Sequence, residues 1–441
     1  MVKVITYGTY DMLHYGHIRL LERAKALGDY LIVGITSDDY DRTRGKINNQ
    51  QSLMERIEAV KQTGLADEII VEEYEGQKID DIKRLGVDIF TLGSDWVGKF
   101  DYLNEYCQVI YLPRTEGVSS TEIRASHRKL RLGIVGTSGV IPKFIREASY
   151  VNGVEIVGLF PDGPVSFPLP EDIETVESYE ALLEHSDAVY VISMPESHYR
   201  HAKQALTLGR HVLCESPIAL NRADCEELFA LAAEKDCLLM DGIKTVYSTA
   251  YSRLALLAKS GKIGKLLSVD AVCTSLMPLP AENLDQKWNS ICAWGPTAML
   301  PVFDILGCHC IKKTVTTHFL DKAIHFDGFT KIDFLYPEAI ASIKVAKAAK
   351  AEGELIISGT TGYIYVPAPW WKTDYFEVRY ENATENKRFF YQLDGEGIRY
   401  EIVAFAKAIE AKRDMNYLPQ SVSEEIAGTI ELLYNGAFLE I

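Results

Sequence analysis

Two histidines with helical spacing lie in a glycine-containing segment near the start of the chain. Residues 8–17 have the sequence GTYDMLHYGH, which places His14 and His17 three positions apart. An apolar run precedes the segment and a helical pattern follows it, so the segment is expected to join a strand to a helix. Free N–H groups at a helix start favour phosphate, and both imidazoles could stabilise charge on a leaving pyrophosphate. Helix capping and metal binding are the alternative roles for this pair.

A second group of phosphate-binding residue types follows the last expected strand of the same region. Residues 114–121 have the sequence RTEGVSST, which combines one guanidinium group with a glycine and several hydroxyls. One guanidinium group can donate hydrogen bonds to two phosphate oxygens at once, and the hydroxyls also suit the start of a helix. Together the two segments predict a site for a polyphosphate ligand.

A further strand, glycine turn and helix begins near residue 130. Residues 132–141 have the sequence LGIVGTSGVI, with Gly136 and Gly139 in the turn. This context is typical of dinucleotide binding, although Ser138 and Ile141 stand where a strict GxGxxG motif has its later glycines. A purely structural glycine turn is the alternative.

Parallel sheets are expected to position both segments. Strand-like runs at 2–7, 30–35, 68–71, 89–92 and 109–111 alternate with helical patterns, and so do runs at 130–135, 155–160, 188–192, 211–214 and 238–241. Each series indicates a doubly wound α/β unit. After residue 245, runs at 267–275, 331–336, 339–347, 353–358 and 363–366 predict a mostly antiparallel sheet, with a hairpin turn at 359–362.

Size and composition limit the class of protein. A chain of 441 residues is too long for a single hydrophobic core, and we expect domains at 1–128, 129–245 and 246–441. The net charge of −16 disfavours nucleic acid as a partner. No apolar run has the length of a membrane span, and no signal peptide is expected. Eight scattered cysteines without a CxxC pair favour reduced thiols and a cytoplasmic protein.

The first 125 or so residues resemble a known family. GTYDMLHYGH resembles the HxGH signature of cytidylyltransferase-type nucleotidyltransferases, and RTEGVSST resembles the RTEGIST signature of the CTP-using branch. The blocks LLERAKALGDYLIVGITSDD, GSDWVGKFDYL and VIYLPRTEG are similar to those of bacterial glycerol-3-phosphate cytidylyltransferases. The resemblance implies transfer of CMP from CTP to glycerol 3-phosphate or a similar short polyol phosphate, which gives CDP-glycerol and pyrophosphate.

The same resemblance implies residue roles. His14 and His17 would be catalytic, and Mg²⁺ would enter with CTP without an assigned protein ligand. Gly64 stands where relatives carry a second arginine, so glycerol 2-phosphate or another short polyol phosphate would also suit the site. The implied CTP-binding residues are Gly8, Thr9, Lys46, Asp95, Arg114, Thr115, Gly117, Ser119, Ser120 and Thr121, and the implied polyol-phosphate-binding residues are Asp11, Arg56 and Lys78.

Residues from about 130 to 441 resemble a second family. ISMPESHYRHA (192–202) and HVLCESP (211–217) are similar to the PNxxHxxxA and CEKP blocks of the Gfo/Idh/MocA oxidoreductases. The resemblance implies NAD or NADP binding by Gly136, Thr137, Ser138, Pro195 and Glu215. Further candidates in this half are His198, His309 and Ser216, although the two histidines could equally be core or surface residues. Ser216 replaces the family lysine and cannot supply its positive charge. Redox activity of this half therefore stays open.

The two resemblances together imply one architecture and leave several functions open. The implied fold is α/β: a Rossmann-like HxGH nucleotidyltransferase domain, a dinucleotide-binding Rossmann domain, and an α+β open-sheet substrate and dimerisation domain. The second half could reduce a keto-phosphate for the first half, or serve only as a sensor or structural platform. The rival interpretations are an NAD(P)-dependent oxidoreductase with a vestigial nucleotidyltransferase, and a non-enzymatic binding protein. The family also implies a homo-oligomer, a dimer or larger, and a pathway to cell-wall or capsule polymers.

Overall fold

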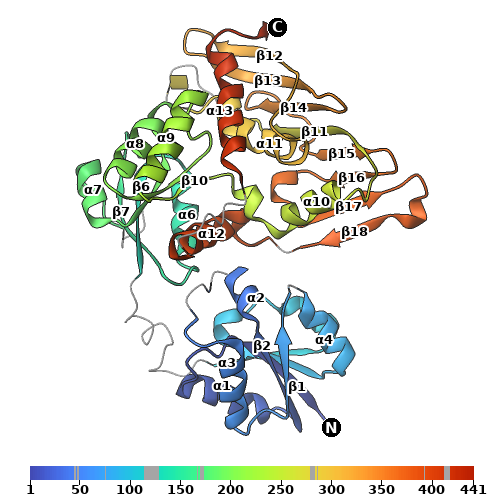
Figure 1. Ribbon diagram of the computed structural model, residues 1–441. Helices are drawn as coiled ribbons and strands as arrows, with labels where there is room; N and C mark the ends of the chain where they lie inside the picture. The colour runs from blue at the N-terminus through green and yellow to red at the C-terminus, as the bar shows by residue number, and fades with distance from the viewer. Residues whose placement is uncertain are drawn as a thin grey trace. The chain divides into compact units, whose positions relative to one another are not determined.

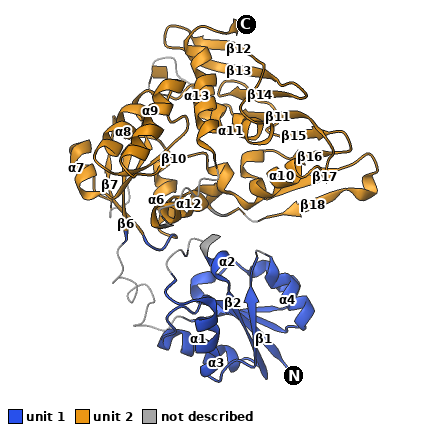
Figure 2. Cartoon of the chain, in the orientation of Figure 1, with its two compact units in different colours: residues 1–129, 151–153 blue, residues 130–150, 154–441 orange. Residues whose placement is uncertain are grey.

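The chain folds into two compact units. A computed structural model describes residues 1–43, 46, 49–74, 76–113, 129–165, 167–168, 173–278, 284–285, 287–391, 393–411 and 418–441. Unit 1 comprises residues 1–129 and 151–153, and unit 2 comprises residues 130–150 and 154–441 (Figure 2). The expected further division at residue 245 stays a prediction. No helix among the described residues has the length and apolar character that crossing a membrane requires.

Unit 1 is built on a parallel sheet, whose strands β1 and β2 are labelled in Figure 1. Its strand order is β3-β2-β1-β4-β5. The central strands are apolar on both faces, as expected for a parallel sheet covered by helices. Val4 and Ile5, neighbours on β1, belong to separate core clusters because successive side chains point to opposite faces. The strands are β1 (Lys3–Gly8), β2 (Tyr30–Thr36), β3 (Glu68–Glu72), β4 (Ile89–Gly93) and β5 (Gln108–Leu112), and the helices are α1 (Tyr15–Lys25), α2 (Asp38–Thr43), α3 (Leu53–Gln62) and α4 (Gln77–Leu85).

Unit 2 begins with a second parallel sheet, in the order β10-β9-β8-β6-β7. Its strands match the expected runs to within a residue at either end, because their apolar residues are buried in the middle of an α/β layer. The strands are β6 (Leu130–Gly136), β7 (Val154–Phe160), β8 (Ala188–Ile192), β9 (His211–Cys214) and β10 (Leu239–Asp241), and the helices are α6 (Ile141–Ala148), α7 (Tyr179–His185), α8 (Pro195–Thr207) and α9 (Arg222–Glu234).

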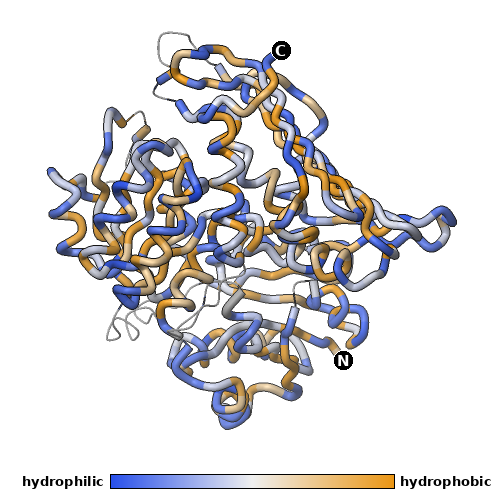
Figure 3. The backbone as a smooth tube through the Cα atoms, turned by 45° about the horizontal axis from the view of Figure 1, so that its top comes forward, coloured by the Kyte–Doolittle hydropathy of each residue, from blue (hydrophilic) through white to orange (hydrophobic). Residues whose placement is uncertain are grey.

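A nine-stranded sheet forms the rest of unit 2, and hydrophobic residues recur along its strands (Figure 3). The expected hairpin at 359–362 is confirmed, because β15 and β16 pair antiparallel with Ser358 opposite Tyr363. Two pairs, β11 with β14 and β12 with β19, are parallel. The strands are β11 (Leu266–Thr274), β12 (Lys312–Asp321), β13 (Phe326–Leu335), β14 (Ile340–Ala346), β15 (Leu355–Gly359), β16 (Tyr363–Val366), β17 (Tyr375–Arg379), β18 (Lys387–Phe390) and β19 (Leu439–Glu440).

Helices connect and cover this sheet. Helix α11 packs on β11, β13 and β14, while α13 packs on α9 and α11 and so joins the two sheets of unit 2 (Figure 1). The helices of this part are α10 (Thr249–Lys259), α11 (Ser290–Leu306), α12 (Ile398–Ala411) and α13 (Gln420–Tyr434), with short 3₁₀ turns η3 (Lys244–Tyr247), η5 (Trp370–Lys372) and η7 (Asp394–Gly397).

Candidate functional site

At the carboxyl end of the sheet of unit 1, the loop between β1 and α1 ends at His14, and His17 lies in the first turn of α1. Tyr10 and Met12 in this loop have positive φ angles of 53° and 49°, which non-glycine residues seldom adopt and which indicate a tightly constrained backbone. The Tyr10 ring is 1% exposed and meets His17 edge-on, with ring centroids 5.5 Å apart. Tyr10 thus packs directly against one of the two imidazoles and fixes its position.

His14 and His17 cap the start of α1 reciprocally. The His14 Nδ1 accepts a 3.1 Å hydrogen bond from the Gly16 N–H, and the His17 Nδ1 accepts a 3.5 Å bond from the His14 N–H. The two rings stack with centroids 3.9 Å apart. Because each Nδ1 is an acceptor, the neutral form of each ring carries its proton on Nε2. The cap therefore selects the tautomer in which both histidines have an Nε2–H donor.

Thr9 and Lys46, two of the predicted CTP-binding residues, meet at a buried carboxylate. The Lys46 ammonium donates to Thr9 Oγ1, which in turn donates to Asp41 Oδ1 over 2.9 Å. The Lys46 Nζ lies 3.9 Å from the same oxygen, and Asp41 is fully buried. The sequence prediction missed Asp41, because its residue type and position do not distinguish it from Asp38 and Asp39 at the same helix start.

Arg56, predicted to bind the polyol phosphate, points into the body of unit 1. It is fully buried, and its Nη1 donates to the backbone oxygens of Thr9 at 2.8 Å and Thr36 at 2.9 Å. The guanidinium also forms ion pairs with Asp38 and, over 3.5 Å, with Asp41. Arg56 therefore links the histidine loop, the end of β2 and helix α2, and its predicted contact with substrate stays untested.

Asp11 and Lys78, the other predicted polyol-phosphate residues, also have partners within unit 1. Asp11 is fully buried and accepts backbone hydrogen bonds from Gln50 at 3.1 Å and Gln51 at 3.0 Å. The Lys78 ammonium pairs with Glu72 and lies 4.7 Å from the centre of the Tyr7 ring. Both side chains thus hold neighbouring segments in place, and a direct role toward substrate stays a prediction.

The remaining predicted residues of unit 1 are spread over several places. Gly8 ends β1, where an added Cβ would approach the Tyr10 ring to 3.0 Å. Asp95 is exposed in the turn after β4. Gly64 directly follows the C-cap of α3 and has a φ of 68°, a left-handed conformation that favours glycine over the arginine of relatives. Arg114, Thr115, Gly117, Ser119, Ser120 and Thr121 lie outside the described residues.

The predicted dinucleotide turn of unit 2 lies between β6 and α6. Gly136 has a φ of 138°, and a Cβ there would stand 2.2 Å from the backbone oxygen of Ile192 on β8. A Cβ on Gly139 would meet no described atom within 4 Å. Thr137 and Ser138 occupy the turn between these glycines and are half-buried. The turn therefore needs glycine at its first position and has room beside its second.

Gly136→Ala is expected to destabilise unit 2 by about 3 kcal/mol, because the new methyl group would overlap a backbone carbonyl that cannot move without shifting β8. Gly139→Ala is the matched control and is expected to unfold like the parent protein. Thermal unfolding of both full-length variants checks this expectation, and NADPH fluorescence shows whether each variant binds the cofactor. Equal stability of the two variants would contradict the close approach at Gly136.

The predicted histidines of unit 2 lie in different environments. His198 is fully buried, with Nδ1 2.8 Å from the Pro217 backbone oxygen and Nε2 2.9 Å from that of Ser193. Burial lowers the pKa of His198, although the backbone oxygens oppose the shift. It therefore links Ser193, two residues before Pro195 at the start of α8, to the segment after β9. His309 lies on the loop after α11 and is exposed, so it is a surface residue and not a core residue.

Glu215 and Ser216 belong to a buried polar cluster at the end of β9. Tyr190 donates to Glu215, and burial raises the pKa of that carboxyl. Burial also raises the pKa of Asp241 to about 7 and the pKa of Glu401 well above its ordinary value. The charge of Lys244 acts on both Glu215 and Glu401. The sequence prediction missed Asp241, Lys244 and Glu401, because these residues come from three separate elements, β10, η3 and α12.

These features define a nucleotidyltransferase-like unit followed by a dinucleotide-fold unit. The family model described as cytidylyltransferase-like matches residues 5–126. A glycerol-3-phosphate cytidylyltransferase of Bacillus spizizenii is 52% identical over 124 residues, which are 28% of this chain and 95% of that relative. Through unit 1, the chain belongs to the glycerol-3-phosphate cytidylyltransferase family, as the two signatures predicted.

Unit 2 is similar to NAD(P)-dependent oxidoreductases, which confirms the second predicted resemblance. The family model for the oxidoreductase family with an NAD-binding Rossmann fold matches residues 130–243. A dTDP-3,4-didehydro-2,6-dideoxy-alpha-D-glucose 3-reductase of Actinomadura kijaniata is 38% identical over 113 residues, 25% of this chain and 34% of that relative. A solved 3-ketoreductase from the same organism, bound to NADP and TDP-benzene, aligns with a TM-score of 0.61 and 19% identity over 71% of this chain and 99% of its own. At that identity the likeness establishes the fold alone.

Proposed function

We propose that unit 1 transfers CMP from CTP to glycerol 3-phosphate, or to a similar short polyol phosphate, and releases pyrophosphate. The observation that carries the proposal is the capped pair His14 and His17, whose tautomers provide two Nε2–H donors beside a helix start. Membership of the glycerol-3-phosphate cytidylyltransferase family supports the choice of nucleotide and acceptor. CDP-glycerol made in this way would serve the synthesis of cell-wall or capsule polymers.

The proposed reaction is a single displacement at the α-phosphorus of CTP. An oxygen of the polyol phosphate forms a bond to this phosphorus, while the bond from phosphorus to the bridging oxygen of pyrophosphate breaks. The attacking oxygen is already ionised at neutral pH, so the reaction needs orientation and charge stabilisation more than a general base. The two histidines would donate to phosphate oxygens as negative charge increases, and Mg²⁺ would enter with CTP.

The remaining residues of unit 1 have proposed roles as well. Thr9 and Lys46, joined at Asp41, would contact the triphosphate, and Asp95 would lie near the nucleoside. Asp11, Arg56 and Lys78 would act on the acceptor side, where their buried contacts hold the histidine loop and its neighbours. The residues of 114–121 named above would complete the triphosphate site.

We further propose that unit 2 binds NAD or NADP and reduces a keto-phosphate to the polyol phosphate that unit 1 consumes. The turn fits a cofactor because Gly136 lets it pack closely on β8, while a Cβ on Gly139 would meet no described atom within 4 Å and so leaves space for a ligand. Thr137, Ser138, Pro195 and Glu215 would complete the dinucleotide site. Bound NAD(P)H would supply the hydride. Ser216 provides no cation for the substrate oxygen, so a regulatory or structural unit 2 is the second candidate.

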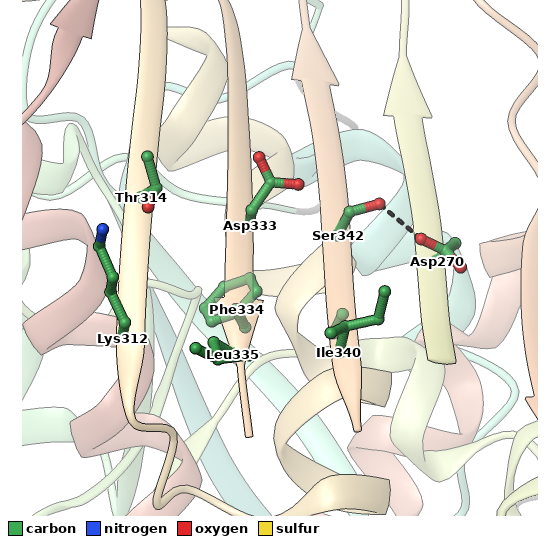
Figure 4. A pocket seen from close by; sticks show the side chains of 9 residues that line it. Asp270, Lys312, Thr314, Asp333, Phe334, Leu335, Ile340 and Ser342 are labelled. Carbon is green, nitrogen blue, oxygen red and sulfur yellow. Dashed lines mark hydrogen bonds between the residues drawn. The ribbon is translucent and has the colours of Figure 1, made fainter. Parts of the chain in front are cut away.

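The wider organisation is also proposed. The domains are 1–128, 129–245 and 246–441, and the protein is cytoplasmic, which eight free cysteine thiols support. It forms a homo-oligomer through the large sheet, where Ile340 is 56% and Leu335 45% exposed beside a hollow of about 400 Å³ (Figure 4). Exposed apolar side chains on one sheet face favour association with a second copy. The hollow also contains Asp270, hydrogen-bonded to Ser342 over 2.6 Å.

Pyrophosphate release from CTP and Mg²⁺ tests the proposal for both units. The acceptors are glycerol 3-phosphate, glycerol 2-phosphate and longer polyol phosphates; glycerol 3-phosphate and the longer ones are also supplied as their keto precursors, with and without NAD(P)H. We expect release with a short polyol phosphate and CTP, and little with ATP, GTP or UTP. Release from a keto precursor only when NAD(P)H is present would establish the reductase. Absence of release with every acceptor would contradict the proposed transfer.

A further inference from the structure

Three lysines of unit 2 surround one carboxylate. The Glu396 Oε2 lies 2.8 Å from the Lys372 Nζ and 3.7 Å from the Lys244 Nζ, and Lys143 donates to its Oε1 over 3.3 Å. The lysines come from η5, η3 and α6, three elements that are far apart in the sequence. Between 27% and 48% of each lysine side chain is exposed, which leaves the group open to solvent. We call these four residues the lysine cluster.

The backbone holds Glu396 in an uncommon conformation. Gly395, Glu396 and Gly397 have φ angles of 56°, 55° and 92°, three left-handed residues in succession. Two of them are glycines, which adopt this conformation readily, but glutamate does so at a cost. The turn leads directly into α12, which packs against α6 and η3 (Figure 1). The contacts with the lysines therefore offset local backbone strain.

Positive charge exceeds negative charge in the lysine cluster. Three ammonium groups face one carboxylate, and the neighbouring pair Glu147 and Arg399, 3.0 Å apart, is neutral overall. Burial opposes ionisation of Glu396, but the lysines outweigh it and lower the pKa of its carboxyl to about 2. Glu215 and Glu401 are the other carboxyls that act on Lys244, and burial raises the pKa of both carboxyls while it lowers the pKa of Lys244. One carboxylate thus neutralises the three lysines incompletely.

We propose that the lysine cluster is a phosphoryl-binding site of unit 2, in which the Glu396 carboxylate holds the place of a phosphoryl group until such a ligand displaces it. A phosphate monoester brings up to two negative charges and three acceptor oxygens, which match three ammonium groups better than one carboxylate does. The glycines on both sides of Glu396 allow its turn to change conformation when the carboxylate leaves.

The site deepens the function proposed for unit 2 and rests on it, although binding itself needs neither reduction in unit 2 nor transfer in unit 1. The phosphoryl group could belong to a small phosphorylated substrate or to the dinucleotide, and both sources share the chemistry that the lysines recognise. The two sources are separated below by titrating each ligand on its own.

Calorimetric titration of the full chain tests the site with dihydroxyacetone phosphate in one arm and NADPH in the other. Saturating CDP-glycerol is present to fill unit 1, and phosphate-free dihydroxyacetone is the ligand control. Lys372→Met is expected to weaken binding of the recognised ligand at least tenfold. Glu396→Gln is expected to strengthen it several-fold, because it removes the competing charge. Lys322→Met, which breaks the exposed pair of Lys322 with Glu440 elsewhere in unit 2, is the matched control and should bind normally.

The outcomes of the titrations show which ligand the lysine cluster binds, or they overturn the proposal. Changes confined to dihydroxyacetone phosphate would assign the site to the substrate, and changes confined to NADPH would assign it to the dinucleotide. Unchanged affinity for both ligands in Lys372→Met, or weaker binding in Glu396→Gln, would overturn the proposal. Pyrophosphate release measured on the same variants should stay at the parent level. If CDP-glycerol does not saturate unit 1, ligand binding to unit 1 adds the same heat in every variant. The difference in affinity between the variants is then unaffected.

Discussion

Replacing His17 with alanine is expected to lower the rate of CMP transfer by roughly a thousandfold. The variant loses an Nε2–H donor whose orientation depends on the cap at the start of α1 and on the edge-on contact with Tyr10. The loss should appear mainly in kcat, because a donor aimed at developing charge acts more strongly in the transition state than in the bound substrate. Steady-state pyrophosphate release with CTP and the preferred polyol phosphate measures it.

Two further variants separate catalysis from capping at this position. His17→Asn keeps an acceptor near the place of Nδ1, where the His14 N–H donates, but lacks a donor at the place of Nε2. It should therefore fold as stably as the parent protein and remain slow, whereas His17→Gln, which restores a distant N–H, should regain part of the rate. His185→Ala changes an exposed histidine of α7 and is the control for rate. Near-parental kcat in His17→Asn would show that the pair serves only as a cap.

Replacing Arg56 with methionine is expected to destabilise unit 1 by about 3–5 kcal/mol, because it leaves the buried Asp41 carboxylate without its guanidinium partner. Backbone oxygens of Thr9 and Thr36 would also lose their donor. The measurement is the free energy of unfolding of unit 1 from denaturant titration of the full chain. Because Thr9 lies at the start of the histidine loop, we expect transfer activity to fall together with stability.

The same experiment distinguishes a structural role for Arg56 from direct contact with the acceptor. Arg19→Met is the control, since Arg19 pairs with Glu22 and the two side chains are 39% and 40% exposed, so its loss should hardly change unfolding. Arg56→Lys keeps the charge but has fewer donors, and should fall between the parent protein and Arg56→Met. An unchanged free energy of unfolding in Arg56→Met, together with a KM for the polyol phosphate raised tenfold, would instead support direct binding.

The parallel sheets of the chain could be predicted well because their signals are local. Apolar runs such as 188–192 and 211–214 coincide with β8 and β9, since a strand buried on both faces needs apolar residues throughout. The nine-stranded sheet was predicted less completely. β12, with the sequence KKTVTTHFLD, has one exposed face and many polar residues, and no local pattern predicted β17 to β19. The pairing of β11 with β14 is parallel, which local patterns do not specify.

The sequence by itself determined the family of unit 1, the histidine pair beside a helix start, and the glycine turn of unit 2, because each is encoded within about ten neighbouring residues. Only the tertiary structure decided that Arg56 points into a buried network and that Lys143, Lys244 and Lys372 meet at Glu396. The physical reason is that burial and electrostatic neighbours depend on which distant segments pack together. The type of a charged residue therefore does not specify whether it contacts the substrate, a buried carboxylate or solvent. The folded chain decides between these three.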